Sequence, residues 1–166
     1  MAINNNQKLT KGMSVIEILV AIFILLVAFS GIAGLLAFSL QISNLNKETI
    51  YANFLAQETL DATRNFRDGT SWSNGLGILA VGDINPYHPA TTDDPPNPPK
   101  WSMVSGEEII GNFTRKVVFE NVNRDSSNDD IVATDGTLDP LTKKAKVTVS
   151  WKNNKVEITT YFTNWK

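Results

Sequence analysis

KGMSVIEILVAIFILLVAFSGIAGLLAFSL, at residues 11–40, is the stretch that decides the fold of this chain. From Ile18 to Leu40 it holds no charged residue, and these 23 residues are enough to cross roughly 30 Å of hydrocarbon as a helix. One carboxylate, Glu17, lies at the head of the apolar run. A charged side chain inside a membrane-length helix costs a few kcal/mol, so such residues are rare and usually have a function.

A short polar leader, residues 1–12, precedes the apolar run and carries Lys8 and Lys11 but no acidic residue. This charge predicts that the N-terminus is cytoplasmic and the rest of the chain lies outside. Three interpretations compete. A secretory signal peptide has an apolar stretch of only about 7–15 residues. A plain single-pass anchor fits the length but leaves Glu17 without a role. A leader that is cut off before the run, with the run retained, fits both features.

Composition limits the possible functions. The 166 residues have room for one modest globular domain beyond the apolar run. The net charge is −2, and removal of the leader leaves 13 basic residues against 17 acidic ones, so we expect no nucleic-acid partner. There is no cysteine and a single histidine, His88, which argues against thiolate and multi-histidine metal sites. We find no nucleophile elbow or phosphate loop, and we expect neither an enzyme nor a cofactor.

The helical pattern continues beyond the apolar run. An apolar stripe recurs at helical spacing, with charged and amide side chains between its members. The stripe consists of Leu45, Ala52, Leu55, Ala62 and Phe66. We therefore expect one helix from about Met13 to about Phe66, whose second half is amphipathic and covers a soluble domain. The alternative is two helices joined near residues 43–46.

The rest of the chain predicts a loop followed by strands. Residues 69–100 are rich in Gly, Asn, Asp and Pro, so we expect a long surface loop that includes His88. Apolar and polar residues alternate in 113–120, 147–152 and 156–163, which is typical of strands with one buried face.

A hairpin turn is expected at Asn153-Asn154, and residues 107–110 suit a short edge strand. The amphipathic half of the helix is the expected cover for the apolar face of the sheet, which occupies residues 101–166. The predicted fold class is therefore α+β, with an antiparallel sheet.

The motif Lys11-Gly12-Met13-Ser14-Val15-Ile16-Glu17, followed by the apolar run, resembles the type IV pilin superfamily of pilins, minor pilins and pseudopilins. The expected helix and sheet agree with that family's architecture. The resemblance implies a leader peptide at 1–12, a transmembrane and assembly helix at 13–40, and a pilin globular domain at 41–166. The specific motif is confined to about the first thirty residues.

The resemblance also implies roles for single residues. Gly12 would precede the bond that a prepilin peptidase cuts, and Met13 would become the N-methylated first residue. Glu17 would pair with the α-amino group of a neighbouring subunit, because two opposite charges in a dry bundle offset each other's desolvation. The implied partners are other pilin subunits, the peptidase, the inner-membrane assembly machinery and the membrane. The implied location is the inner membrane first, and then a cell-surface or periplasmic filament.

The sequence departs from the family pattern at three points. Met13 stands where many members have Phe, Gly31 and Gly34 replace a mid-helix proline, and no disulfide can form. Met13 and the run EILVA at 17–21 favour a minor, PilV- or GspI-like subunit. The alternatives are a type II secretion or competence pseudopilin, and a single-pass anchored extracellular binding module that does not polymerise.

Residues 125–139 hold five aspartates between two expected strands. Calcium takes several carboxylate and carbonyl oxygens from such loops, so four of them are candidate ligands. These are Asp125, Asp129, Asp130 and Asp135. The spacing lacks the EF-hand pattern, so a solvated loop without a metal is the favoured interpretation.

Overall fold

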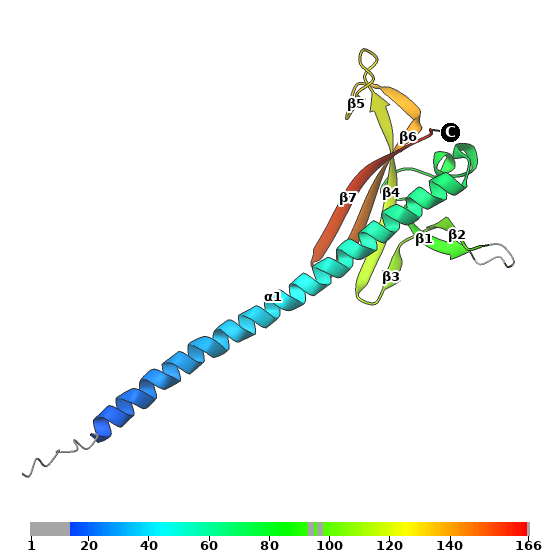
Figure 1. Cartoon of the computed structure of the whole chain (residues 1–166). Coiled ribbons are helices and arrows are strands. Elements are labelled where there is room, and N and C mark those ends of the chain that lie inside the picture. Colours follow the sequence, from blue (N-terminus) through cyan, green and yellow to red (C-terminus); the bar gives the residue numbers. More distant parts are fainter. Residues whose placement is uncertain (1–13, 93–94, 96–97, 166) are drawn as a thin grey trace, which may run out of the picture. The chain divides into compact units, whose positions relative to one another are not determined.

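The protein is described here from a computed structural model, which places residues 14–92, 95 and 98–165. The chain divides into two compact units, residues 1–46 and residues 47–166. The described residues form one long helix, two short 3-10 turns and a seven-stranded antiparallel sheet, so the layout is α+β as predicted (Figure 1). Gly12 and Met13 lie outside the described residues.

The helix α1 spans Val15–Gly69 without a break, so one helix forms rather than two. The segment contains no proline, and each of its ends carries a charge that suits the helix dipole. Glu17 lies in the first turn and Arg67 in the last. Gly31 and Gly34 lie within the continuous helix.

The described part of the first unit consists of Ser14 and the apolar part of α1. Every described residue from 14 to 46 is exposed. This part of α1 is long and apolar enough to span a membrane. No residue in its most apolar stretch of 18 residues is buried.

In the second unit, one stripe of α1 is buried. Its members are Ala52, Leu55, Ala56, Thr59, Leu60, Ala62 and Thr63. The predicted positions Ala52, Leu55 and Ala62 are confirmed, and Phe66 packs at the edge of the core, whereas Leu45 is exposed. The sequence pattern did not predict the burial of Thr59 and Thr63. Their hydroxyls donate to the backbone carbonyls four residues earlier at 2.7 Å, so burial leaves no unpaired polar group.

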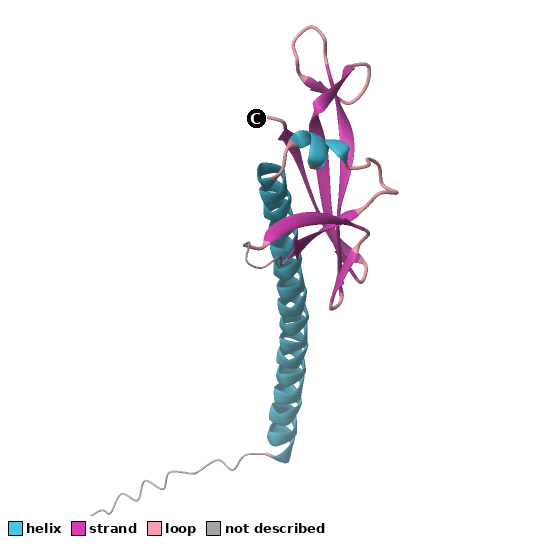
Figure 2. Ribbon diagram, turned by 90° about the vertical axis from the view of Figure 1, so that its right-hand side faces the viewer, coloured by secondary structure: helices cyan, strands magenta, loops and turns pink. Residues whose placement is uncertain are grey.

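The main path of the sheet has the order β2-β1-β4-β6-β7, with all pairs antiparallel. Figure 2 shows the strands of the sheet in magenta. The strands are β1 Tyr87–Thr92, β2 Lys100–Ser105, β3 Glu108–Ile110, β4 Phe113–Arg124, β5 Ile131–Val132, β6 Thr137–Trp151 and β7 Asn154–Thr163. Both β3 and β5 also pair with β4. The three long predicted strands and the short strand at 107–110 are therefore confirmed, and β4 and β6 are longer than predicted.

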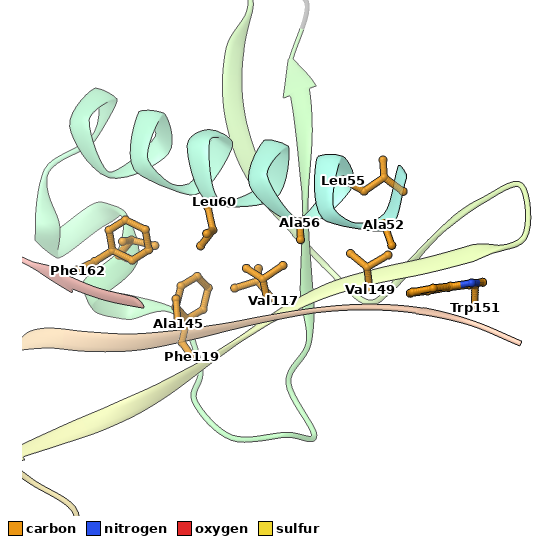
Figure 3. Close-up of a cluster of buried hydrophobic side chains, with 12 residues drawn as sticks. Ala52, Leu55, Ala56, Leu60, Val117, Phe119, Ala145, Val149, Trp151 and Phe162 are labelled. Atoms are coloured by element: carbon orange, nitrogen blue, oxygen red, sulfur yellow. The ribbon is translucent and has the colours of Figure 1, made fainter. Parts of the chain in front are cut away.

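The core lies between α1 and one face of the sheet (Figure 3). Its buried members are Ala52, Leu55, Ala56, Leu60, Leu76, Val117, Phe119, Ala145, Val147, Val149, Trp151 and Phe162. The alternation in β4 and β6 places Val117, Phe119, Val147 and Val149 on this face, as the sequence pattern predicts. Val118, which belongs to the other set of alternating residues, is also buried although it is not part of this cluster.

The predicted loop at 69–100 is wrong in part. It contains the 3-10 turns η1 (Trp72–Asn74) and η2 (Leu76–Ile78), and also β1, so the sheet begins at Tyr87 rather than at residue 101. His88 lies half-buried in β1, with its Nδ1 3.1 Å from the carbonyl oxygen of Gly106. The proline-rich composition of residues 69–100 favoured a loop, so β1 was not predicted. Since β1 pairs with β4 at a single position, most of its length has an open side that tolerates Pro89.

Two smaller predictions also need correction. The β6–β7 turn consists of Lys152 and Asn153, because Trp151 pairs with Asn154, and Lys152 takes the positive φ of 50°. Apolar residues of both strands must face the core, and this requirement sets the register. The expected loop at 125–139 contains β5 and the first residues of β6.

Candidate functional site

The candidate assembly site is the first turn of α1. The carbonyl oxygen of Ser14 accepts hydrogen bonds from the N–H groups of Glu17 (2.9 Å) and Ile18 (3.2 Å), which starts the helix. The Glu17 side chain is exposed, and the next charged residue along the chain is Lys47. Glu17 is therefore the one carboxylate of a long apolar surface.

The first turn also offers Glu17 a local role that the sequence reasoning missed. Ser14 directly precedes α1, and Glu17 follows three residues later. This Ser-x-x-Glu order is the signature of a capping box, in which side chains bond the free N–H groups of the first turn. The helix dipole also favours a carboxylate at this end. A local cap and a charge pair with another chain are thus separate roles, which an experiment must distinguish.

The four aspartates proposed for calcium lie at or near the β4–β5 and β5–β6 connections. The Asp125 carboxylate accepts hydrogen bonds from the N–H (2.8 Å) and the hydroxyl (2.7 Å) of Ser127. Both hydrogen bonds lower the pKa of Asp125, and the one from the N–H has the larger effect. Asp130 accepts a bond from Asn128 at 2.9 Å. Asp129 and Asp135 have positive φ angles of 60° and 63°.

These contacts show aspartates that shape turns. Within residues 14–92, 95 and 98–165, no three His, Asp or Glu side chains gather where they could hold a metal ion. Calcium binding by this loop stays the less favoured of the two interpretations, and the structure tests neither.

Two groups of polar contacts connect the second unit's part of α1 to the sheet, and the sequence pattern predicted neither. Glu48 accepts hydrogen bonds from the indole N–H of Trp151 at 3.1 Å and from the Lys152 ammonium. Arg115 on β4 donates to Glu58 on α1 at 2.9 Å and to Glu108 on β3. The Arg115 side chain is only 7% exposed, so these two carboxylates compensate a buried charge.

Comparison with protein-family models, with curated proteins and with solved structures finds no match for this chain. The functional assignment therefore depends on the N-terminal residues and on the physical chemistry of the uncovered apolar helix.

Proposed function

We propose that this chain is a type IV pilin-like prepilin, a structural subunit that assembles into a surface filament or primes its assembly. The leader is cut after Gly12, Met13 is N-methylated, and the subunits associate through Glu17 and their apolar helices. The observation that carries the proposal is Glu17, the one carboxylate at the head of a membrane-length apolar helix with no buried residue in its most apolar window.

The uncovered helix supports the proposal on energetic grounds. Burial of apolar surface contributes about 25 cal/mol per Å² to stability. The described residues of the first unit are all exposed, so this part of α1 is stable only in lipid or against other apolar helices. Before assembly, lipid covers the apolar surface of the helix, and after assembly, copies of the same helix cover it.

Glu17 then gives the association a specific register. A carboxylate in a dry helix bundle needs a cation nearby, because an unpaired charge there is strongly destabilising. Cleavage after Gly12 would create such a cation, the α-amino group of Met13 in an adjacent subunit. The partners are therefore other subunits, a prepilin peptidase and the inner-membrane assembly machinery.

The first test is mass spectrometry of the mature N-terminus in a strain that has the processing enzymes. The proposal expects a chain that begins at methylated Met13, and Gly12→Arg should leave the leader attached. An intact Met1, or a cut beyond the apolar run, would remove the proposal.

The second test separates the two roles of Glu17. Glu17→Gln keeps a side chain that can cap the helix but removes the charge, whereas Glu17→Leu removes both. We expect both variants to be processed yet to lose nearly all incorporation into sheared filaments, with the second unit still folded by circular dichroism. Ser14→Ala is the matched control, since it weakens the cap alone and should assemble.

Normal assembly of Glu17→Gln together with failure of Ser14→Ala would mean that Glu17 is only a cap. Full function of Glu17→Leu would favour an anchored binding module that does not polymerise.

A further inference from the structure

A hollow of about 340 Å³ lies at the end of the sheet where β4, β5, β6 and β7 come together. Three of its side chains form one cross-strand row, because Glu120 on β4 faces Lys144 on β6, which faces Tyr161 on β7. Their chain neighbours Phe119, Ala145 and Phe162 belong to the core. Side chains alternate along a strand, so this row lies on the sheet face opposite the core.

An irregularity in strand pairing lies next to the hollow. Between Asn121 and Val122 of β4, the partner on β6 changes from Lys143 to Asp139. Bulges of this kind redirect side chains and are frequent next to functional sites. Beyond the shift, β5 pairs with β4 at Asn123, and both residues of β5 line the hollow. Figure 1 shows β5 beside the end of β4.

The charges in the hollow cancel. The Lys144 ammonium donates to the Glu120 carboxylate at 2.9 Å. Lys146 approaches the same carboxylate at 3.6 Å but lies closer to Asp83, at 3.2 Å, so the two ammonium groups face two carboxylates. Both partners of the closer pair are about one-third exposed, so a ligand can still reach them. A paired site of this kind offers no net charge to attract an anion or a metal cation.

The rest of the lining combines polar and apolar residues. Val122, Ile131, Val132 and Ala133 are the apolar ones. Asn121 and Asn123 are also among the lining residues, and an asparagine amide can both donate and accept hydrogen bonds. The Tyr161 side chain is 45% exposed and provides an aromatic face with a polar tip. A volume near 340 Å³ is at the lower end of the range of small-molecule sites.

We propose that this hollow binds a neutral saccharide. The ring of Tyr161 packs against the less polar face of the sugar, and the two amides with the Glu120–Lys144 pair bond its hydroxyl groups. This site lies on the second unit and is independent of the filament role proposed above, so either function can fail without the other.

The test is saturation-transfer NMR and titration calorimetry on the full chain in lipid nanodiscs, because maltoside and glucoside detergents would themselves present sugars. The probes are methyl β-glucoside, methyl β-galactoside and the disaccharide of N-acetylglucosamine, with glucose 6-phosphate as the charged comparison. We expect saturable binding of at least one neutral probe, in the millimolar range, and weaker binding of the phosphate.

Tyr161→Ala should lower the affinity about tenfold, whereas Tyr161→Phe should keep most of it, since the ring remains. Asn123→Ala provides a second loss variant in case Tyr161→Ala unfolds. Phe54→Ala is the matched control, because Phe54 is an exposed aromatic outside the hollow, and it should bind as the unchanged chain does. Absence of saturable binding, unchanged binding by both loss variants, or preference for glucose 6-phosphate would each overturn the proposal.

Discussion

At the scale of single residues, Glu48 fastens α1 to the turn between β6 and β7. The hydrogen bond from Lys152 lowers the pKa of Glu48 more than burial raises it, and the Lys152 charge and the Trp151 indole lower it further. A depressed pKa in the folded state stabilises the fold above the unfolded value of about 4.3, and this stabilisation is lost as the pH falls below that value. Glu48→Gln should therefore lower the unfolding temperature at neutral pH, and the difference from the unchanged chain should shrink in acid.

Glu157→Gln is the matched control for this prediction. Its carboxylate pairs with Lys155, which is 68% exposed, so the curve of unfolding temperature against pH should stay close to that of the unchanged chain. A constant difference between Glu48→Gln and the unchanged chain from neutral to acidic pH would contradict the assignment.

At the scale of elements, Arg115 joins α1, β3 and β4 through Glu58 and Glu108. Either carboxylate alone still compensates the buried guanidinium, so we expect Glu58→Gln and Glu108→Gln each to cost about 1 kcal/mol of unfolding free energy. The double variant leaves the guanidinium unpaired and should cost about 3–5 kcal/mol. Chemical denaturation of the four chains measures this double-mutant cycle, and additive effects would show that the two carboxylates act independently.

At the scale of the whole molecule, the two units have different requirements for solvent. The buried residues of α1 begin at Ala52, and the described residues of the first unit contribute none to the core. A fragment of residues 47–166 should therefore fold in water without detergent and unfold cooperatively in circular dichroism. A fragment of residues 58–166 should not fold, because it lacks Glu48, Ala52 and Leu55. Aggregation or loss of structure in the longer fragment would show that the first unit is needed for folding.

Local patterns in the sequence determined the features that depend on near neighbours. The uninterrupted apolar run specifies a membrane-length helix, and the lone Glu17 marks its head. Alternation at 113–120, 147–152 and 156–163 specifies strands with one buried face, because side chains on a strand repeat every two residues. These features were predictable since each is encoded within a few turns or a few strand residues.

Only the tertiary structure decided the features that depend on distant partners. Pairing with β2 makes β1 a strand in spite of Pro89, and the contacts of Arg115 join residues up to 57 positions apart. The hollow at Tyr161 is lined by residues of β4, β5, β6 and β7, which are far apart in the sequence. No short window of sequence contains both sides of such a contact, so its existence follows from packing and register rather than from local propensity.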